Sequence, residues 1–242
     1  MKDFYTVLDV PIISYSSFHK IEESLGDHWK DEVWYSMEKA GKEELSIAIH
    51  KGHFSSDGVP WITVHCDGGW SKRSYGHSYN ALSGTAVVIG KETGLVLFVG
   101  VQNKYCCICT RAANLRQFPS QHRCFKNWEA SSTGMEADIL VEAFNNSISM
   151  HGVKYLKMIG DGDSSVYSKI RSNVSYGMEV DKIECVNHLI KNFGKSLYKI
   201  KTSATNDGVS SQARKMLTNE KIKKLQQFIM YRAKINENVE DL

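Results

Sequence analysis

The chain has 242 residues and a mass of 27.3 kDa, with 42% hydrophobic and 24% charged residues. This size and balance are typical of one globular domain with an appended segment, and they exclude collagen-like, low-complexity and wholly disordered proteins. The net charge of +3 is unevenly distributed, since residues 1–180 hold 18 basic and 20 acidic side chains, whereas residues 181–242 hold 12 and 7. The basic C-terminal part could meet a phosphate backbone, but from charge alone a solvated helical face is the favoured interpretation.

The sequence predicts no membrane partner and no secretory signal. Its longest apolar runs are far shorter than the ~20 residues that span a bilayer, and the first residues lack a basic, apolar and small-residue pattern. We therefore expect a reducing compartment, in which clustered cysteines favour a metal site over disulfides. The six cysteines are Cys66, Cys106, Cys107, Cys109, Cys124 and Cys185.

Residues 1–58 are expected to form a helical annex. Ser16 and Ser17 would cap a helix over residues 18–25, and a longer polar helix would cover residues 31–50. Glycines at positions 52 and 58 then break the helical pattern.

Residues 59–202 show the pattern of an α/β core. Strands are expected at 61–66, 81–89 and 95–101, and the Gly-containing turn at 90–94 makes the last two a hairpin, so the three form a meander. After them, helices and short strands alternate: helix 135–151, strand 155–159, helix 164–170, strand 182–186 and helix 187–199. Antiparallel strands followed by helix-linked parallel ones predict a ribonuclease-H-like mixed sheet with flanking helices. Residues 203–211 are expected to form a polar loop, and the rest of the chain a charged helical segment.

Two aspartates stand at predicted strand ends. Asp67 follows the first strand and Asp161 follows the fourth, and in a ribonuclease-H-like sheet these two strands are neighbours. Paired carboxylates suit Mg²⁺ or Mn²⁺, which supports in-line phosphoryl transfer. The alternative is that each Asp-Gly pair only makes a turn, and Asp163 is interpreted as a helix cap.

The cysteine-rich segment, residues 105–128, has the spacing of a metal site. Cys106 and Cys109 form a C-x-x-C pair, and His122 and Cys124 follow after twelve residues, which predicts a structural Cys₃His zinc site. Cys107 could replace either neighbour as a ligand. A redox disulfide between Cys106 and Cys109 is the other alternative, but it would not explain the presence of His122 and Cys124.

A second short pair, Cys185 and His188, lies where a strand passes into a helix. Only two potential ligands are present here, and their spacing alone does not support a metal site. We therefore interpret the pair as a buried cysteine beside a hydrogen-bonded histidine.

Five sequence blocks together resemble the Mutator-like transposase domain: VHCDGGWSKRSYGHSYNALSGTAVVIG, KYCCICTRAANLRQFPSQHRCFKNW, SSTGMEADILVEAF, KMIGDGDSSVY and IECVNHLIKN. The resemblance runs from about residue 10 to residue 230, with the blocks in the family's order. It implies a ribonuclease-H-like core with an Asp, Asp, Glu triad, in which Asp67 is the first carboxylate and Asp161 the second. It also implies Cys185 and His188 as the family's Cys-x-x-His motif, and it covers the four zinc-ligand candidates.

The resemblance implies a metal-dependent enzyme that cleaves and transfers DNA strands in the nucleus. It also allows a homo-oligomer. DNA-binding candidates are Lys72, Arg73, Lys191 and Lys195. The third carboxylate should follow a helical insertion, of which residues 203–242 would be the start. Glu220, Glu237 and Glu240 lack a preceding strand, so we expect the chain to stop before that carboxylate and to be impaired as an enzyme. The alternatives are a catalytically inactive, zinc-stabilised DNA-binding or interaction module derived from a transposase, and a relic reading frame.

Overall fold

A computed structural model describes residues 13–72, 80–161, 164–203 and 208–240 of the chain. It contains one five-stranded mixed sheet with the order β3-β2-β1-β4-β5. The strands are β1 (Trp61–Trp70), β2 (Ser83–Gly90), β3 (Val96–Asn103), β4 (Lys154–Gly160) and β5 (Asp181–Glu184). β1, β2 and β3 pair antiparallel, whereas β4 is parallel to both β1 and β5. The predicted meander, the mixed α/β class and the pairing of the first strand with the fourth are therefore confirmed.

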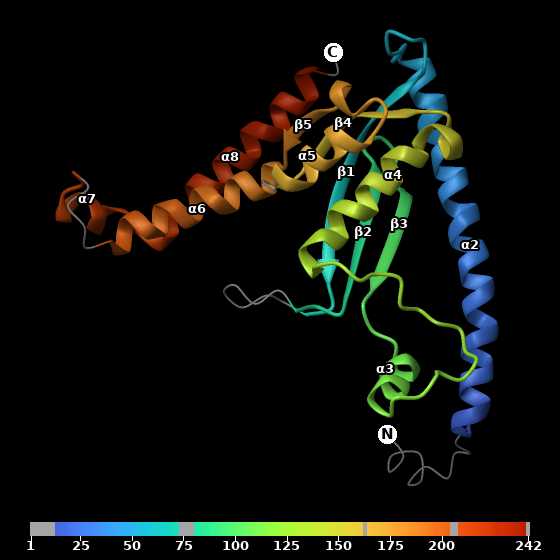
Figure 1. Ribbon diagram of the computed structural model, residues 1–242. Coiled ribbons are helices and arrows are strands. Elements are labelled where there is room, and N and C mark those ends of the chain that lie inside the picture. Colours follow the sequence, from blue (N-terminus) through green and yellow to red (C-terminus); the bar gives the residue numbers. More distant parts are fainter. Residues whose placement is uncertain (1–12, 73–79, 162–163, 204–207, 241–242) are drawn as a thin grey trace.

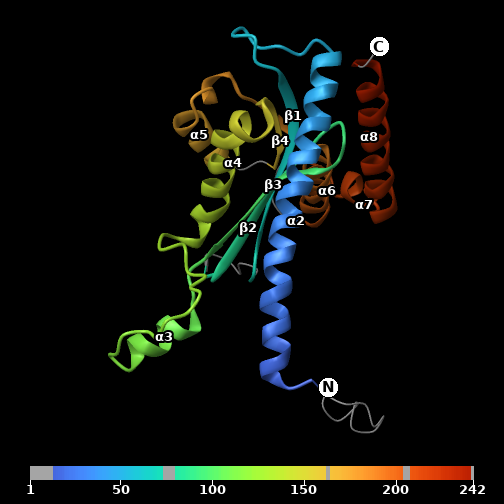
Figure 2. The ribbon, with the colours of Figure 1, turned by 90° about the vertical axis from the view of Figure 1, so that its right-hand side faces the viewer.

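The helices are α2 (Tyr15–His50), α3 (Cys107–Asn114), α4 (Met135–His151), α5 (Ser164–Asn173), α6 (Val186–Thr202), α7 (Ser211–Met216) and α8 (Asn219–Glu240). Short 3₁₀ turns lie at Ser132–Gly134 and Gly177–Glu179. In Figures 1 and 2, α4 and α5 cover one face of the sheet, α2 runs along its β3 edge, and α6 and α8 extend from the β5 side. None of the helices in the described ranges is long and apolar enough to span a membrane.

The core lies between α4 and the sheet. The apolar stripe of α4 includes Ile139, Leu140 and Phe144, all at most 1% exposed, and it packs with Val64 of β1 and Val88 of β2 in one buried cluster. Gly152, with φ of 68°, ends the helix where the sequence predicts, because glycine adopts the left-handed conformation at little cost. α4 thereby fixes the orientation of the β1–β4 pair.

The N-terminal annex differs from the prediction, because one continuous helix replaces the two expected. Gly26 does not interrupt α2, since a helical glycine costs only about 1 kcal/mol relative to alanine and no proline is present in the helix. The cap is Ser14, whose side chain accepts a hydrogen bond from the Ser17 N–H, and not Ser16 or Ser17.

Other elements also differ from expectation. β1 continues past Asp67 to Trp70 because its pairing with β2 extends to Gly84. β5 ends at Glu184, two residues early, since α6 begins at Val186. The sequence did not predict α3. Part of the expected 203–211 loop, residues 204–207, lies outside the described residues, as does the proposed helix cap Asp163.

α2 is anchored to the core by two buried polar side chains. Glu44 is fully buried, and its Oε1 accepts hydrogen bonds of 2.9 Å from the N–H and the hydroxyl of Thr93, in the β2–β3 turn. His151 is 5% exposed, fills the space beside Gly41, and contacts the Leu97 carbonyl through Nε2 at 3.0 Å. These contacts join α2, α4 and the hairpin into one body.

The burial of His151 predicts a pH-dependent stability. Desolvation is the main cause that lowers its pKa below the usual 6.5, so the unfolded chain binds a proton more readily than the folded one. The free energy of unfolding should therefore decrease as the pH falls from about 7.5 to about 5. Urea denaturation across this range should show a flatter dependence for His151→Gln. The same change at His50, an exposed residue of α2, should leave the slope unaltered.

Candidate functional site

Asp67 and Asp161 lie at the same level of two adjacent parallel strands. The last paired residues of β1 and β4 are His65 and Ile159, and each aspartate lies two positions further along its chain. Because adjacent strands are about 4.8 Å apart and side chains alternate between faces, both carboxylates are expected on one face of the sheet. The sequence predicted that the two strands are neighbours, which the pairing confirms, although Asp67 lies within its strand and not at its end.

Both aspartates are exposed to solvent. Asp67 accepts a hydrogen bond of 2.9 Å at Oδ1 from the Gly68 N–H. Between the two strands, Gly160 is buried, and a Cβ atom built on it would lie 3.8 Å from the Cys66 carbonyl oxygen. β1 and β4 are therefore in ordinary contact just before the two carboxylates, which are open to solvent at the edge of the sheet toward the C-terminal ends of these strands.

Glu136 is a third carboxylate near this edge that sequence reasoning missed. It lies in the first turn of α4, and its Oε1 would be 2.8 Å from a Cβ atom on Gly68. Since neighbouring residues of a strand face opposite sides, Glu136 approaches from the α4 face, whereas Asp67 faces the other. In the described ranges, no group of three or more carboxylates, histidines or cysteines at this edge has its ligand atoms within 4.8 Å of one another.

The Cys185–His188 pair lies at the start of α6, next to the C-terminal end of β4. The Cys185 N–H donates a hydrogen bond of 2.9 Å to the Gly160 carbonyl, immediately before Asp161. Cys185 is half-buried, and Nδ1 of His188 is buried without a hydrogen-bond partner among the described residues. This differs from the expected buried cysteine and hydrogen-bonded histidine, because α6 begins next to the end of β4, where Asp161 is exposed, and not inside the core.

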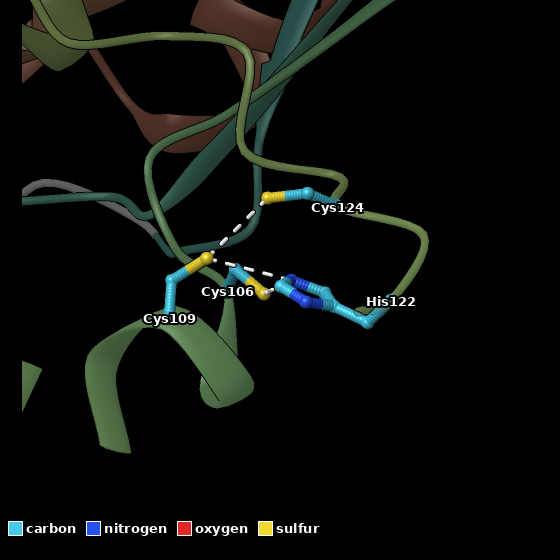
Figure 3. Close-up of side chains that lie close together, drawn as sticks. All are labelled: Cys106, Cys109, His122 and Cys124. Atoms are coloured by element: carbon cyan, nitrogen blue, oxygen red, sulfur yellow. Dashed lines mark hydrogen bonds between the residues drawn. The ribbon is translucent and has the colours of Figure 1, made fainter. Parts of the chain in front are cut away.

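The cysteine-rich segment brings four possible metal ligands together (Figure 3). The ligand atoms of Cys106, Cys109, His122 and Cys124 all lie within 4.8 Å of one another. Nε2 of His122 is 3.2 Å from Sγ of Cys106 and 3.4 Å from Sγ of Cys109. The sulfurs of Cys109 and Cys124 are 3.6 Å apart.

These separations fit a tetrahedral zinc site. With Zn–S near 2.3 Å and Zn–N near 2.0 Å, a tetrahedron has S–S edges of about 3.8 Å and S–N edges of about 3.5 Å. Nδ1 of His122 lies 2.7 Å from the Ser120 carbonyl, which fixes the proton on Nδ1 and leaves the Nε2 lone pair for a metal. The four residues can therefore hold a metal such as zinc.

Hydrogen bonds within the cluster shift the pKa values of three of its four residues. A hydrogen bond from the Cys109 N–H is the main cause that lowers the pKa of Cys106 to about 6, so this thiol ionises readily. The pKa of Cys109 is raised to about 11, mainly by its hydrogen bond with the Cys124 thiol. The pKa of His122 is raised to about 9, first by its bond to the Ser120 carbonyl. Metal binding would therefore release the protons of Cys109 and His122, because a metal binds thiolate and neutral imidazole.

The alternatives for the other cysteines are resolved by their positions. Cys107 is exposed and is not a member of the four-residue group, so the structure does not place it as a substitute ligand. All six cysteines are free, and the Cys106–Cys109 disulfide is not formed.

The candidate DNA-binding lysines are all exposed. Lys72 follows β1, and Lys191 and Lys195 lie one turn apart on α6. α6 packs on α8 through Gly194, which lies against Gln226, so the two lysines are carried on a supported helix. Arg73 lies outside the described residues.

The comparisons with known proteins identify the family. None of the curated proteins searched matches the chain. The sequence profile of the Mutator-like transposases matches residues 1–242, the whole of the chain. The chain with its Cys₃His cluster and its mixed five-stranded sheet therefore belongs to the Mutator-like transposase family.

Proposed function

We propose that the chain is the catalytic domain of a DNA transposase with a ribonuclease-H-like core, which cleaves and transfers DNA strands with a divalent cation. The family match supports a transposase origin. The order β3-β2-β1-β4-β5, with antiparallel and parallel pairs on opposite sides of β1, supports the ribonuclease-H-like assignment. We also propose that the protein acts on chromosomal DNA in the nucleus.

The observation that carries the proposal is the register of Asp67 and Asp161 on adjacent strands. Carboxylate oxygens are the preferred protein ligands of Mg²⁺ and Mn²⁺, so these two residues would hold the ion. The bound ion would lower the pKa of an attacking hydroxyl and stabilise the leaving oxygen. Water would be the nucleophile in the first step and a freed 3′-hydroxyl in the second.

The remaining candidate residues would position the DNA. Lys72 and Arg73 follow Asp67 closely in the chain, and Lys191 and Lys195 lie on α6, which begins beside Asp161. Contacts with phosphates fix the register of a duplex without reading its sequence. In the cysteine-rich segment, zinc would be structural, because all four of its tetrahedral positions would be filled by protein ligands.

The test is a nicking assay on supercoiled plasmid with the purified chain. We expect nicked product to accumulate slowly, as for an impaired enzyme, with Mn²⁺ or Mg²⁺ and not with Ca²⁺, which binds carboxylates but prefers a larger and less regular coordination shell. Absence of nicking with every metal, in protein that binds DNA, would reject the enzymatic proposal for this chain.

That outcome would favour a second function, a zinc-stabilised DNA-binding module without catalysis. The specific observation behind it is that the described residues assemble a complete Cys₃His cluster, whereas they assemble no comparable group of three carboxylates around Asp67 and Asp161. A gel-shift titration run beside the nicking assay separates the two functions, because the module binds and does not cleave.

A further inference from the structure

The cysteine-rich segment carries basic and aromatic side chains on its surface. Residues 105–128 contain four basic and no acidic residues. Three aromatic side chains in the same segment are exposed: Tyr105 at 48%, Phe118 at 99% and Phe125 at 61%. Positive charge interleaved with exposed rings is typical of surfaces that bind nucleic acid.

The turn that precedes Phe118 has a defined backbone conformation. Arg116, directly after the end of α3, has φ of 53°, the only non-glycine residue of the described ranges with a positive φ. The N–H groups of Arg116 and Gln117 donate to the carbonyls of Ala113 and Ala112 at 3.0 and 2.9 Å, which closes the helix end. Glycine would adopt this conformation at lower cost, so Arg116 has a locally strained backbone. These hydrogen bonds fix the backbone immediately before Phe118.

Two arginines of the segment have no acidic partner among the described residues. Arg123 pairs with Asp27 at 2.8 Å and also lies over the Phe125 ring, and Lys126 pairs with Glu129 at 3.1 Å. Arg111, in the last turn of α3, and Arg116 are exposed and make no such pair in the part of the chain that the structure describes. Arg116 precedes Phe118 by two residues and Arg111 precedes it by seven, so both cations belong to the short stretch of chain that carries the exposed ring.

The position of the segment relative to the sheet fits a role in holding DNA. β3 leads directly into it, and Figures 1 and 2 show α3 beyond the ends of β1, β2 and β3, apart from α4 and the sheet. β1 and β3 run in the same direction, since both are antiparallel to β2. The end of β3 that carries the segment is therefore the end of β1 that carries Asp67.

We propose that residues 105–128 form a DNA-binding surface, in which Arg111 and Arg116 contact phosphates and the Phe118 ring stacks on an unpaired base. A ring that is 99% exposed loses contact with water on stacking, and every base offers it a flat apolar face. The inference rests on the proposed function for the choice of DNA as the ligand. It does not depend on catalysis.

The experiment measures binding without Mg²⁺ or Mn²⁺, using zinc-loaded chain and a fluorescent duplex with a short single-stranded 3′ flap that contains 2-aminopurine. Phe118→Ala should weaken flap binding about tenfold, abolish the quenching of 2-aminopurine, and leave binding to the blunt duplex unchanged. Phe118→Trp should retain both. Arg111→Gln and Arg116→Gln should weaken binding to both DNAs and each reduce the salt slope by about one.

Two variants on α2 serve as matched controls: Tyr15→Ala removes an aromatic ring that is 82% exposed, and Lys39→Gln removes an exposed charge. Both should bind as the parent does, and every variant should contain as much zinc as the parent.

Parent-like flap affinity and quenching in Phe118→Ala, or unchanged salt slopes in both arginine variants, would overturn the proposal. Tighter binding to RNA of the same sequence would also overturn it, in favour of an RNA surface. These binding measurements need neither the catalytic cation nor cleavage, so a failure of the catalytic proposal would leave their outcome unchanged.

Discussion

Replacing Asp67 with asparagine should reduce metal-dependent nicking by about a thousandfold or more, since catalytic groups that act as a unit lose most of their effect when one is removed. Asparagine preserves the size of the side chain and its hydrogen bond at Oδ1, but it removes the negative charge that attracts the cation. DNA binding should remain within about twofold of the parent, because the exposed lysines and arginines are untouched. The measurement is single-turnover nicking of plasmid with Mn²⁺, beside an anisotropy titration.

Asp161→Asn should have the same effect, and the double variant should be little worse than either single one. The control is Asp181→Asn, which removes an exposed carboxylate from the opposite end of β5. It should nick at the parental rate. If Asp67→Asn cleaves DNA as the parent does, the assignment of the carboxylates is wrong.

The second large effect is expected at the cysteine cluster. His122→Ala should weaken zinc binding at least about a hundredfold, because it removes one of four ligands from a site whose binding energy is also the folding energy of its segment. The cysteine-rich segment should then become sensitive to proteases, since α3 stands apart from the sheet and α4. Metal analysis of protein purified without chelator gives the zinc content, and limited proteolysis with mass spectrometry locates the cuts.

Cys107→Ser is the matched control for the cluster. Cys107 neighbours Cys106 in the chain, yet it is exposed and contributes no atom to the four-residue group. The variant should keep about one zinc per chain and resist proteolysis. Zinc well below one per chain in the parent, or loss of zinc in Cys107→Ser, would contradict the ligand set.

The elements that sequence reasoning placed well are those with a strong local pattern. α4 was predicted over residues 135–151, which are its observed bounds, because its apolar stripe and the glycine at position 152 both act locally. The four ligands of the cluster could be predicted from spacing, since a C-x-x-C turn and a returning His-x-Cys leave few other arrangements. The neighbouring positions of Asp67 and Asp161 followed from the strand order.

Features that depend on contacts distant in sequence could not be predicted. The Asp-Gly-Gly pattern after Cys66 indicates a turn, but pairing with β2 carries β1 on to Trp70. Glu136 meets Gly68 only because α4 crosses the sheet at that point. The left-handed conformation of Arg116 has no sequence signal, since glycine or asparagine would be expected there.

The most direct test of the central claim is whether Asp67 and Asp161 bind one divalent cation together. Titration of zinc-loaded chain with Mn²⁺, followed by the electron paramagnetic resonance signal of the free ion, measures this binding without any DNA. We predict a site in the parent and in Asp181→Asn that is lost in both Asp67→Asn and Asp161→Asn. Undiminished Mn²⁺ binding in either of those two variants, or no binding in the parent, would contradict the account.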